Sequence, residues 1–334
     1  MNLESKKQIK AAITALGGYV PDTILSNADL EKMVDTNDAW ISSRTGIKER
    51  RILKDKSKAT SFLAIEAAND LILKNQVDPK TIDLVLVATV TPDMPVAATA
   101  AYVASSIGAK NAFAYDLSAA CSGFLYGMST SVSYICSGRY KKVLLIGADK
   151  MSSIVDYTDR TTSIIFGDGA GAVLFEPSTN AYGWEDEYFR SDGQERMSLG
   201  IKAGGSLYPA SKETVENKLH YLYQEGKTVF KYAVSEMANA TAEILKRNAL
   251  SGSDIDYLVP HQANKRIIDA TAQRIGLNEK QVLVNIANYG NTTAATIPLL
   301  LNDYKSKFKR GDKMIFAAFG GGFTWGSAYL TWAY

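Results

Sequence analysis

The chain of 334 residues carries 37 Lys and Arg against 35 Asp and Glu, a formal net charge of +2 that gives no overall attraction for nucleic acid. Hydrophobic residues make up 46% and charged residues 22%, which is typical of a globular protein and excludes disordered, collagen-like and coiled-coil classes. Two cysteines and two histidines leave little material for a disulfide framework or a metal site.

The first ten residues contain no apolar run long enough for a signal peptide, and no stretch of about 18 uninterrupted apolar residues predicts a membrane span. We therefore expect a cytoplasmic protein that enters no membrane, binds no nucleic acid and holds no metal. The length corresponds to about two domains.

Landmarks of the first half of the chain recur in the second half in the same order. The helix-like segments that end at residues 72–74 and 244–246 both read Ile-Leu-Lys, and they are 172 positions apart. The apolar runs around Ile82 and Ile255 follow them at an offset of 173. A predicted strand that begins beside a lysine also recurs, and so does the glycine-rich strand at the end of each half. These pairs indicate an internal duplication.

Within each half, helical and strand patterns alternate. Short apolar runs at 84–87 and 143–146 are typical of strands that are covered on both faces. Alternation of this kind predicts an α/β fold with two similar lobes, mixed but mainly parallel sheets, and covering helices. Apolar residues at spacings of three and four predict the buried helix faces, namely Phe62, Ile65, Ala68 and Ile72, then Phe230, Ala233, Met237, Ala240 and Ile244.

We place the boundary between the lobes near Pro177, so that the first covers residues 1–177 and the second 178–334. A polar stretch follows this proline, and glycines and a proline recur up to Asn217. The segment 178–217 is therefore predicted to be an irregular loop insertion.

Cys121 is the first candidate for a catalytic group. It lies between a predicted strand at 112–117 and a helical pattern that begins at Phe124. A thiol at the N-terminus of a helix is expected to have a lowered pKa, because the helix dipole stabilises the thiolate. The alternative is a buried structural cysteine, which is how we interpret Cys136 on the same helix.

His261 and Asn291 are the candidates in the second half. His261 follows a predicted strand at 257–259, where α/β folds place functional groups. Asn291 lies 170 positions after Cys121, so the duplication makes these two positions equivalent. For His261 a structural role is at least as good an interpretation of the local sequence. For Asn291 the alternative is a helix-capping or turn residue, and the duplication argues against it.

The glycine-rich runs 167–171 and 320–322 are followed by strand patterns and not by helices. They therefore match neither a phosphate-binding loop nor a dinucleotide fingerprint. Close backbone packing beside a site, with N–H groups free to hold an oxyanion, is the better interpretation.

Together these residues resemble the β-ketoacyl-acyl-carrier-protein synthases III, which have a thiolase-like fold, and the resemblance extends over nearly the whole chain. Six motifs carry it in order. They are Asp38-Ala39-Trp40-Ile41 with Arg44-Thr45-Gly46-Ile47, the Cys121 turn, Phe166-Gly167-Asp168-Gly169-Ala170-Gly171, Pro260-His261-Gln262-Ala263-Asn264, Tyr289-Gly290-Asn291-Thr292, and Gly320-Gly321-Gly322-Phe323-Thr324-Trp325-Gly326.

The resemblance implies a decarboxylative condensation of an acyl-CoA with malonyl-acyl carrier protein in fatty acid synthesis. Cys121 would carry the acyl group, and His261 and Asn291 would hydrogen-bond the malonyl thioester oxygen. The N–H groups of Cys121 and Gly321 would form an oxyanion hole, and Phe319 would wall off the acyl pocket. Coenzyme A thioesters would be substrates, with no bound cofactor.

The same resemblance assigns the binding residues and implies a homodimer. Trp40 and Arg160 would sandwich the CoA adenine, Arg44 would contact a phosphate, and Asn264 would contact CoA. Carrier-protein contacts would come from a stretch on the second lobe with two basic helpers, because the carrier is acidic. These residues are Gln262, Ala263, Asn264, Lys265, Arg266, Lys231 and Arg274.

Two positions depart from the family pattern. Val96 stands where many members have an aromatic residue that closes the partner's acyl pocket, so we expect tolerance for branched or longer acyl groups. Lys227 stands where many members have an asparagine that contacts the pantetheine arm.

Other condensing enzymes of this fold remain alternatives. Thiolases need a second cysteine after Cys136, and elongating synthases need a histidine where Asn291 stands. Type III polyketide synthases share the Cys, His and Asn set but usually have a Gly-Phe-Gly-Pro-Gly motif, which the chain lacks. A starter synthase of secondary metabolism that uses malonyl-CoA stays open. A papain-like peptidase and a non-catalytic scaffold on this fold are the alternatives of other classes.

Overall fold

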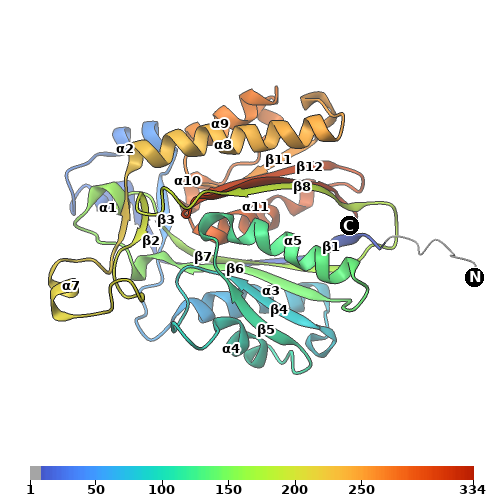
Figure 1. Ribbon diagram of the computed structural model, residues 1–334, viewed down its shortest axis with the longest axis horizontal. Helices are drawn as coiled ribbons and strands as arrows, with labels where there is room; N and C mark the ends of the chain where they lie inside the picture. Colours follow the sequence, from blue (N-terminus) through green and yellow to red (C-terminus); the bar gives the residue numbers. More distant parts are fainter. Residues whose placement is uncertain (1–8) are drawn as a thin grey trace, which may run out of the picture.

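Two β-sheets lie between layers of helices in the computed structural model, which describes residues 9–334 (Figure 1). The first sheet has the strand order β1-β7-β6-β4-β5. The strands β6, β4 and the edge strand β5 run parallel, while β7 and β1 run antiparallel to their neighbours. The strands are β1 (Ala11–Tyr19), β4 (Leu84–Ala88), β5 (Phe113–Leu117), β6 (Val143–Lys150) and β7 (Asp168–Pro177).

The second sheet repeats this pattern in the order β11-β12-β13-β8, with a parallel pair β11–β12 and antiparallel pairs beyond it. Val282 forms an isolated parallel bridge with Leu258 where the first sheet has β5. The predicted duplicated α/β fold with mixed sheets is therefore confirmed, but the expectation of mainly parallel sheets is wrong. Four antiparallel pairs stand against three parallel ones in the two large sheets, because the glycine-rich strands return antiparallel. The strands are β8 (Gly183–Ser191), β11 (Tyr257–Pro260), β12 (Lys313–Gly320) and β13 (Thr324–Thr331).

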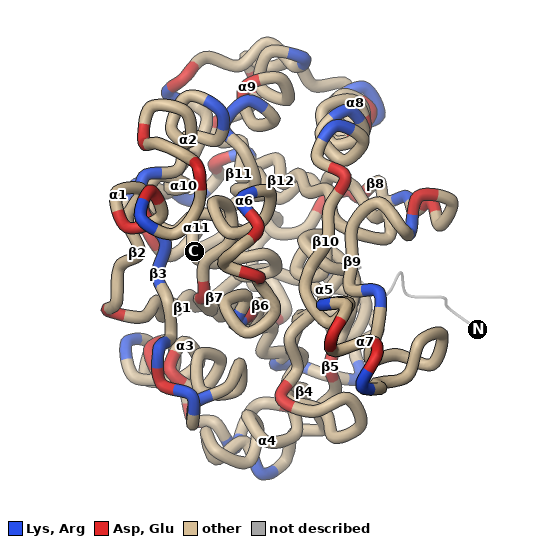
Figure 2. Tube along the Cα trace, turned by 90° about the vertical axis from the view of Figure 1, so that its left-hand side faces the viewer, with Lys and Arg blue, Asp and Glu red and all other residues tan. Residues whose placement is uncertain are grey.

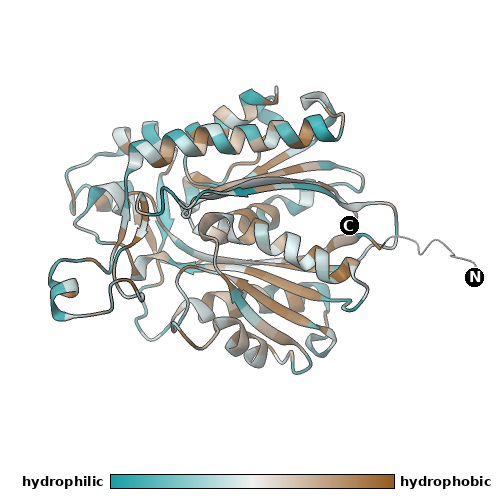
Figure 3. Cartoon of the chain, viewed as in Figure 1, coloured by the Kyte–Doolittle hydropathy of each residue, from teal (hydrophilic) through white to brown (hydrophobic). Residues whose placement is uncertain are grey.

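Three layers of helices enclose the sheets. α5 (Gly123–Cys136) and α11 (Thr296–Tyr304) lie between the two sheets and contact strands of both (Figures 1 and 3). α3 (Thr60–Asn75) and α4 (Thr99–Ser106) cover the outer face of the first sheet. α8 (Gly226–Arg247) and α9 (Lys265–Arg274) cover the outer face of the second.

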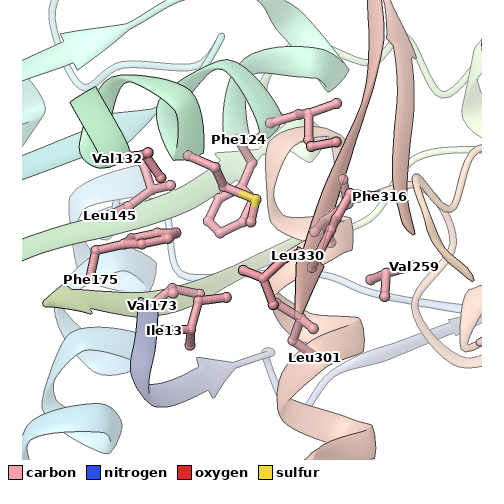
Figure 4. Packing of buried hydrophobic residues seen from close by; sticks show 14 of the residues in the cluster. Ile13, Phe124, Val132, Leu145, Val173, Phe175, Val259, Leu301, Phe316 and Leu330 are labelled. Atoms are coloured by element: carbon pink, nitrogen blue, oxygen red, sulfur yellow. The ribbon is translucent and has the colours of Figure 1, made fainter. Parts of the chain in front are cut away.

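The central core joins the two lobes. Phe124 on α5 lies among Val173 of the first sheet and Phe316 and Leu330 of the second, and all four side chains are buried (Figure 4). Burying an aromatic or leucine side chain contributes about 1.5–3 kcal/mol. The inner helices therefore stabilise one continuous core across both lobes.

The buried face of α3 differs from the prediction. Of the four predicted residues only Ala68 is fully buried, whereas Leu63, Ala64, Ala67 and Leu71 form the buried stripe. Small side chains are favoured there because α3 approaches the sheet closely: a Cβ at Gly17 would lie 2.5 Å from the Ala67 carbonyl oxygen.

The segment 178–217 is more ordered than the irregular insertion we predicted. Gly183–Ser191 forms β8, an edge strand of the second sheet, and Lys212–Glu216 forms the short helix α7. The consecutive acidic residues Glu185, Asp186 and Glu187 of β8 obscure the strand pattern in the sequence. β9 (Leu199–Ile201) pairs with β10 (Leu222–Gln224) beside this helix. We propose that the lobes divide after β7, which ends at Pro177.

α1 (Asn27–Leu30), α2 (Asp38–Thr45), β2 (Ile24–Ser26) and β3 (Glu49–Arg51) lie toward one end of the molecule (Figure 1). β2 pairs with β3. Two further short helices are α6 (Arg160–Ser163) and α10 (Ile286–Tyr289). No helix among residues 9–334 is long and apolar enough to cross a membrane. Residues 1–8, on which the signal-peptide prediction partly rests, lie outside the described residues.

Candidate active site

Equivalent turns present one candidate residue from each lobe. The 3₁₀ turn Ala120–Ser122 lies between β5 and α5 and contains Cys121. The 3₁₀ turn Thr293–Ala295 precedes α11 and follows Asn291 by two residues. Ala120 and Thr293 both have a positive φ, 47° and 56°, which non-glycine residues rarely adopt. The same unusual backbone bend thus occurs at both turns, and both turns contact each other between the sheets.

The Cys121 thiol is deeply buried, with 8% of the residue exposed. Burial raises the pKa of this thiol to about 12, and the nearby negative charge of Asp149 adds to the increase. A hydrogen bond from Asn291 opposes both effects. The prediction of a lowered pKa is therefore wrong for the unliganded protein, because desolvation exceeds the stabilisation at the helix end. Cys121 rests as a thiol.

Asn291 is held so that its amide group faces Cys121. Its backbone N–H donates to the Ile165 carbonyl over 2.9 Å, and its Oδ1 accepts from the Thr293 N–H over 2.8 Å. Because the oxygen is already engaged by the backbone, the side-chain amide N–H groups are the ones available for the thiol or a substrate.

His261 follows β11 directly and is 3% exposed. Its Nδ1 lies 2.7 Å from the hydroxyl of Thr296, the first residue of α11. Its Nε2 is buried and finds no hydrogen-bond partner within residues 9–334. Burial lowers the pKa of this imidazole to about 3, so the ring is neutral at physiological pH. A neutral ring with one unpartnered nitrogen is ready to exchange a proton or a hydrogen bond with a ligand.

One cavity of about 890 Å³ brings the predicted residues of both lobes together. Cys121, His261, Asn291, Phe319 and Gly321 all line it. Its mouth and its apolar end differ in chemistry. The mouth is lined by Trp40, Arg44, Arg160, Lys227, Asn264 and Arg266, and the apolar wall by Val90, Met151, Ile154, Phe166 and Leu222.

At the mouth, cationic groups lie over aromatic rings. The Arg160 guanidinium lies 5.7 Å from the Trp40 ring centre, and the Arg266 guanidinium lies 4.6 Å from that of Phe230. Asn264 caps α9 by accepting from the Arg266 N–H over 2.9 Å, which fixes the start of that helix beside the cavity. Both pairs offer a flat, positively charged surface suited to an aromatic base and phosphates.

The turn that contains Gly321 is tied to the Cys121 turn. The Thr324 hydroxyl lies 3.0 Å from the carbonyl oxygen of Ala119 and 3.2 Å from that of Gly321, and its single proton is donated to one of them at a time. The Ser122 hydroxyl in turn donates to the Thr324 carbonyl over 2.9 Å. Gly320 between them must lack a side chain, since a Cβ there would lie 2.7 Å from the Cys121 nitrogen. The glycine run thus allows close packing, as predicted.

Three neighbouring residues that the resemblance assigned to carrier-protein binding have different surroundings. Gln262 is 1% exposed, and its amide hydrogen-bonds the carbonyls of Pro260 and Leu283 while its oxygen accepts from residues 285 and 286. It therefore has no surface to offer a carrier protein, a point that corrects the expectation. Ala263 lines the main cavity. Lys265 pairs with Asp269 along α9.

The other residues that were assigned to binding and do not line the main cavity lie on the molecular surface. Lys231 is exposed on α8, and Arg274 lines a separate surface hollow of about 570 Å³. Val96 is 97% exposed and does not line the cavity of its own chain, so any contribution to an acyl pocket requires a second molecule.

Asp149 is a buried residue near the thiol that the sequence did not single out. One carboxylate oxygen accepts from the N–H of Val90 over 2.8 Å and from the hydroxyl of Thr89 over 3.0 Å. The other accepts from the N–H of Ala294 over 3.2 Å. Asp149 thus joins the apolar wall of the cavity to the turn beside Asn291. Burial raises its pKa to about 6.

Replacing Asp149 with Asn removes a negative charge that raises the pKa of Cys121. We expect that pKa to fall by about one unit, so that alkylation by iodoacetamide at pH 8 becomes roughly tenfold faster. Asp168→Asn is the matched control, since Asp168 is equally buried and does not perturb Cys121. Equal alkylation rates in wild type and Asp149→Asn would contradict this electrostatic coupling.

Comparison with known proteins agrees with this geometry. Two family models, described as 3-oxoacyl-[acyl-carrier-protein (ACP)] synthase III and its C-terminal part, match residues 115–193 and 245–332. A β-ketoacyl-[acyl-carrier-protein] synthase III of Bacteroides thetaiotaomicron is 54% identical, with 98% of both chains covered. That of Chlorobium chlorochromatii is 56% identical over 97% of this chain and 100% of the relative.

Solved structures give the same result. The 3-oxoacyl-[acyl-carrier-protein] synthase III of Aquifex aeolicus has a TM-score of 0.88 at 39% identity, covering 97% of this chain and 100% of that one. The Thermus thermophilus enzyme has a TM-score of 0.89 at 40% identity, with 96% and 99% covered. The duplicated fold, the cavity shared by the lobes and these full-length similarities together place the chain in the β-ketoacyl-[acyl-carrier-protein] synthase III family of acyltransferases.

Proposed function

We propose that Cys121, His261 and Asn291 carry out the initiating condensation of fatty acid synthesis, in which an acyl-CoA reacts with malonyl-acyl carrier protein. The observation that carries this assignment is their presence on the wall of one cavity. The apolar part of that cavity suits an acyl chain, and its mouth has the aromatic and cationic pairs that suit CoA.

In the first half-reaction the Cys121 sulfur attacks the thioester carbonyl of acyl-CoA. Because the pKa of the thiol is high, its proton must leave as the S–C bond forms, and the bare Nε2 of neutral His261 is the acceptor. The carbonyl oxygen gains negative charge near the N–H groups of Cys121 and Gly321. When the C–S bond to CoA breaks, the CoA sulfur takes the proton from His261.

In the second half-reaction the malonyl thioester loses CO₂, and the electron pair of the broken C–C bond forms an enolate. Once CoA has left, His261 releases its Nδ1 proton to solvent and takes up a proton from solvent on Nε2. The Asn291 amide N–H and this Nε2–H then donate to the enolate oxygen, an interaction worth about 3–4 kcal/mol for a well-placed donor. The enolate carbon attacks the acyl-Cys121 carbonyl, 3-oxoacyl-carrier protein leaves, and the Cys121 thiolate regains a proton from solvent.

The carrier protein docks beside the mouth of the cavity, where Lys and Arg positions lie on α8 and α9 (Figure 2). Arg266 lines the mouth and Lys231 lies exposed on α8. An acidic carrier is attracted to such a patch although the net charge of the chain is close to zero.

Reversing the charge of Arg266 tests this docking site. Arg266→Glu is expected to raise KM for malonyl-acyl carrier protein about tenfold or more, because a contact at the interface is lost and a repulsion is added. The KM for malonyl-CoA, measured with the same variant, should change far less. Arg139→Glu, an exposed arginine beyond the far end of α5, is the control. A parallel rise of both KM values in Arg266→Glu would contradict carrier docking there.

We further propose that two copies of the chain form a homodimer along β5. This strand is the last of the first sheet, and no described strand pairs with its outer edge. Exposed apolar side chains surround it, namely Met94 (59%), Val96 (97%), Tyr102 (60%) and Phe113 (39%). An exposed edge with an apolar rim indicates association. Sedimentation velocity should give twice the monomer mass.

In such a dimer Val96 reaches the cavity of the partner and limits its depth. Val96→Phe is expected to lower the rate with isobutyryl- and hexanoyl-CoA about tenfold relative to acetyl-CoA, because a larger side chain fills space that a longer acyl group needs. Initial rates with the three substrates measure this. Unchanged ratios, or a wild type that accepts only acetyl-CoA, would contradict this role of Val96.

A starter synthase of polyketide metabolism is the second candidate. The priming β-ketosynthase of the R1128 polyketide pathway has a TM-score of 0.89 at 30% identity, with 100% and 99% of the chains covered. Discharge of the acyl-enzyme by malonyl-CoA in preference to malonyl-acyl carrier protein would favour this candidate.

A further inference from the structure

We infer that Thr296 is a positioning residue that sets the tautomer of His261, so that Nδ1 carries the ring proton and Nε2 faces the cavity as an acceptor. The inference rests on the proposed role of His261 as the group that takes the Cys121 proton. It concerns a hydroxyl that touches the histidine ring.

The hydrogen bonds around Thr296 identify the tautomer. Its hydroxyl lies 3.1 Å from the carbonyl of Thr293, which can only accept, and 2.7 Å from the Nδ1 of His261. A hydroxyl has one proton to donate. If it donates to the carbonyl, its oxygen accepts from an Nδ1–H, and both hydrogen bonds form together. With the proton on Nε2 instead, the hydroxyl must choose between its two partners.

Burial strengthens the preference for a proton on Nδ1 of His261. Thr296 is 2% exposed and His261 is 3% exposed, so water does not replace a lost hydrogen bond. The unpartnered Nε2 then carries a free lone pair, on the side of the ring away from Thr296, and the His261 side chain lines the cavity that Cys121 also lines. Such a nitrogen accepts the thiol proton when the S–C bond forms, and it returns that proton to the CoA sulfur.

The Thr296 hydroxyl can also support His261 in the second half-reaction. The enolate oxygen needs a donor, and therefore a proton on Nε2, so after CoA has left Nδ1 must release its proton to solvent and Nε2 must take one up from solvent. The Thr296 hydroxyl can rotate and donate to a bare Nδ1 in that state, because oxygen in a hydroxyl is both donor and acceptor. Carbonyl or ammonium groups at this position offer only one of these roles. Thr296 therefore supports His261 as an acceptor in the first step and as a donor in the second.

The direct test is ¹⁵N NMR of histidine-labelled protein, in which protonated and bare ring nitrogens give well-separated signals. The chain has only two histidines, and His220→Gln assigns the second set of signals. The expected result for the resting wild-type enzyme is a protonated Nδ1 and a bare Nε2 for His261. A protonated Nε2 in the resting enzyme would overturn the inference.

Three variants complete the test. Thr296→Val keeps the shape but removes the hydroxyl, so we expect mixed tautomer signals and a five- to tenfold lower rate of Cys121 acylation by acyl-CoA. Thr296→Ser should restore both the single tautomer and the rate. Thr241→Val is the matched control, since the buried Thr241 hydroxyl bonds only the Met237 carbonyl on α8. Equal losses of rate in Thr296→Val and Thr241→Val, with one unchanged tautomer, would overturn the inference.

Failure of the inference is distinguishable from failure of the proposed function. If His261→Ala acylates Cys121 as fast as wild type, the proposed proton acceptor is wrong. If His261→Ala loses acylation while the NMR signals show the opposite tautomer, the role of His261 stands and that of Thr296 falls.

Discussion

Wild-type protein incubated with acetyl-, isobutyryl- or hexanoyl-CoA should gain a single acyl group, and Cys121→Ser should gain none. The thiol is the nucleophile of the proposed reaction, and a buried hydroxyl is a much weaker one at neutral pH. We expect the overall rate to fall by about 10⁴-fold or more. Intact-mass spectrometry, followed by digestion to locate the adduct, measures this directly.

Cys136→Ser is the matched control for this experiment. Cys121 precedes α5 and is buried in the cavity, whereas Cys136 is the last residue of α5 and is exposed. The interpretation of Cys136 as a buried cysteine is therefore wrong. Cys136→Ser should therefore acylate like wild type. An adduct that persists in Cys121→Ser would show that another residue carries the acyl group. An adduct that malonyl-acyl carrier protein fails to discharge would refute the proposed second substrate.

Asn291→Ala should separate the two half-reactions. We expect decarboxylation of malonyl-acyl carrier protein to fall about 10²–10³-fold, because one donor to the enolate oxygen is lost. Acylation of Cys121 should fall much less, since Asn291 affects that step only through its hydrogen bond to the thiol. Release of ¹⁴CO₂ from labelled malonyl-carrier protein and the acyl adduct measured by mass spectrometry report the two steps separately.

Asn288→Ala is the control for this variant, because Asn288 lies exposed on α10 three residues before Asn291. It should leave both half-reactions unchanged. Equal losses of acylation and decarboxylation in Asn291→Ala would instead indicate that the turn as a whole has shifted, and the assignment of Asn291 as an enolate donor would then be wrong.

Much of the fold and the position of the site follow from patterns within the sequence. The repeat placed Cys121 and Asn291 at equivalent turns, and the structure brings these turns into contact. The strand before His261 was equally readable, because its apolar run is short and ends at a proline. Internal symmetry therefore sufficed to single out Cys121 and Asn291, whereas the roles of His261, Phe319 and Gly321 came from the resemblance to a known family.

Properties that depend on distant residues were not predictable. The pKa of Cys121 is set by burial and by Asp149, whereas the sequence shows only the helix start beside it. Gln262 occurs in a recognisable motif, but its four hydrogen bonds inside the protein show that it is structural. A signal for Asp149 was present: an acidic residue that follows a run of apolar and small residues in a buried strand needs partners in the core.

The left-handed backbone at Ala120 and Thr293 has a consequence for how firmly the two turns hold their shape. A residue with a side chain stores about 1–2 kcal/mol of strain in this conformation. Glycine at either position would release that strain, but it would also give the unfolded chain more freedom, so the net change in stability would be small. What glycine would remove is stiffness. Ala120 and Thr293 keep both turns rigid before substrate binds. The local strain is therefore accompanied by preorganisation of Cys121 and Asn291.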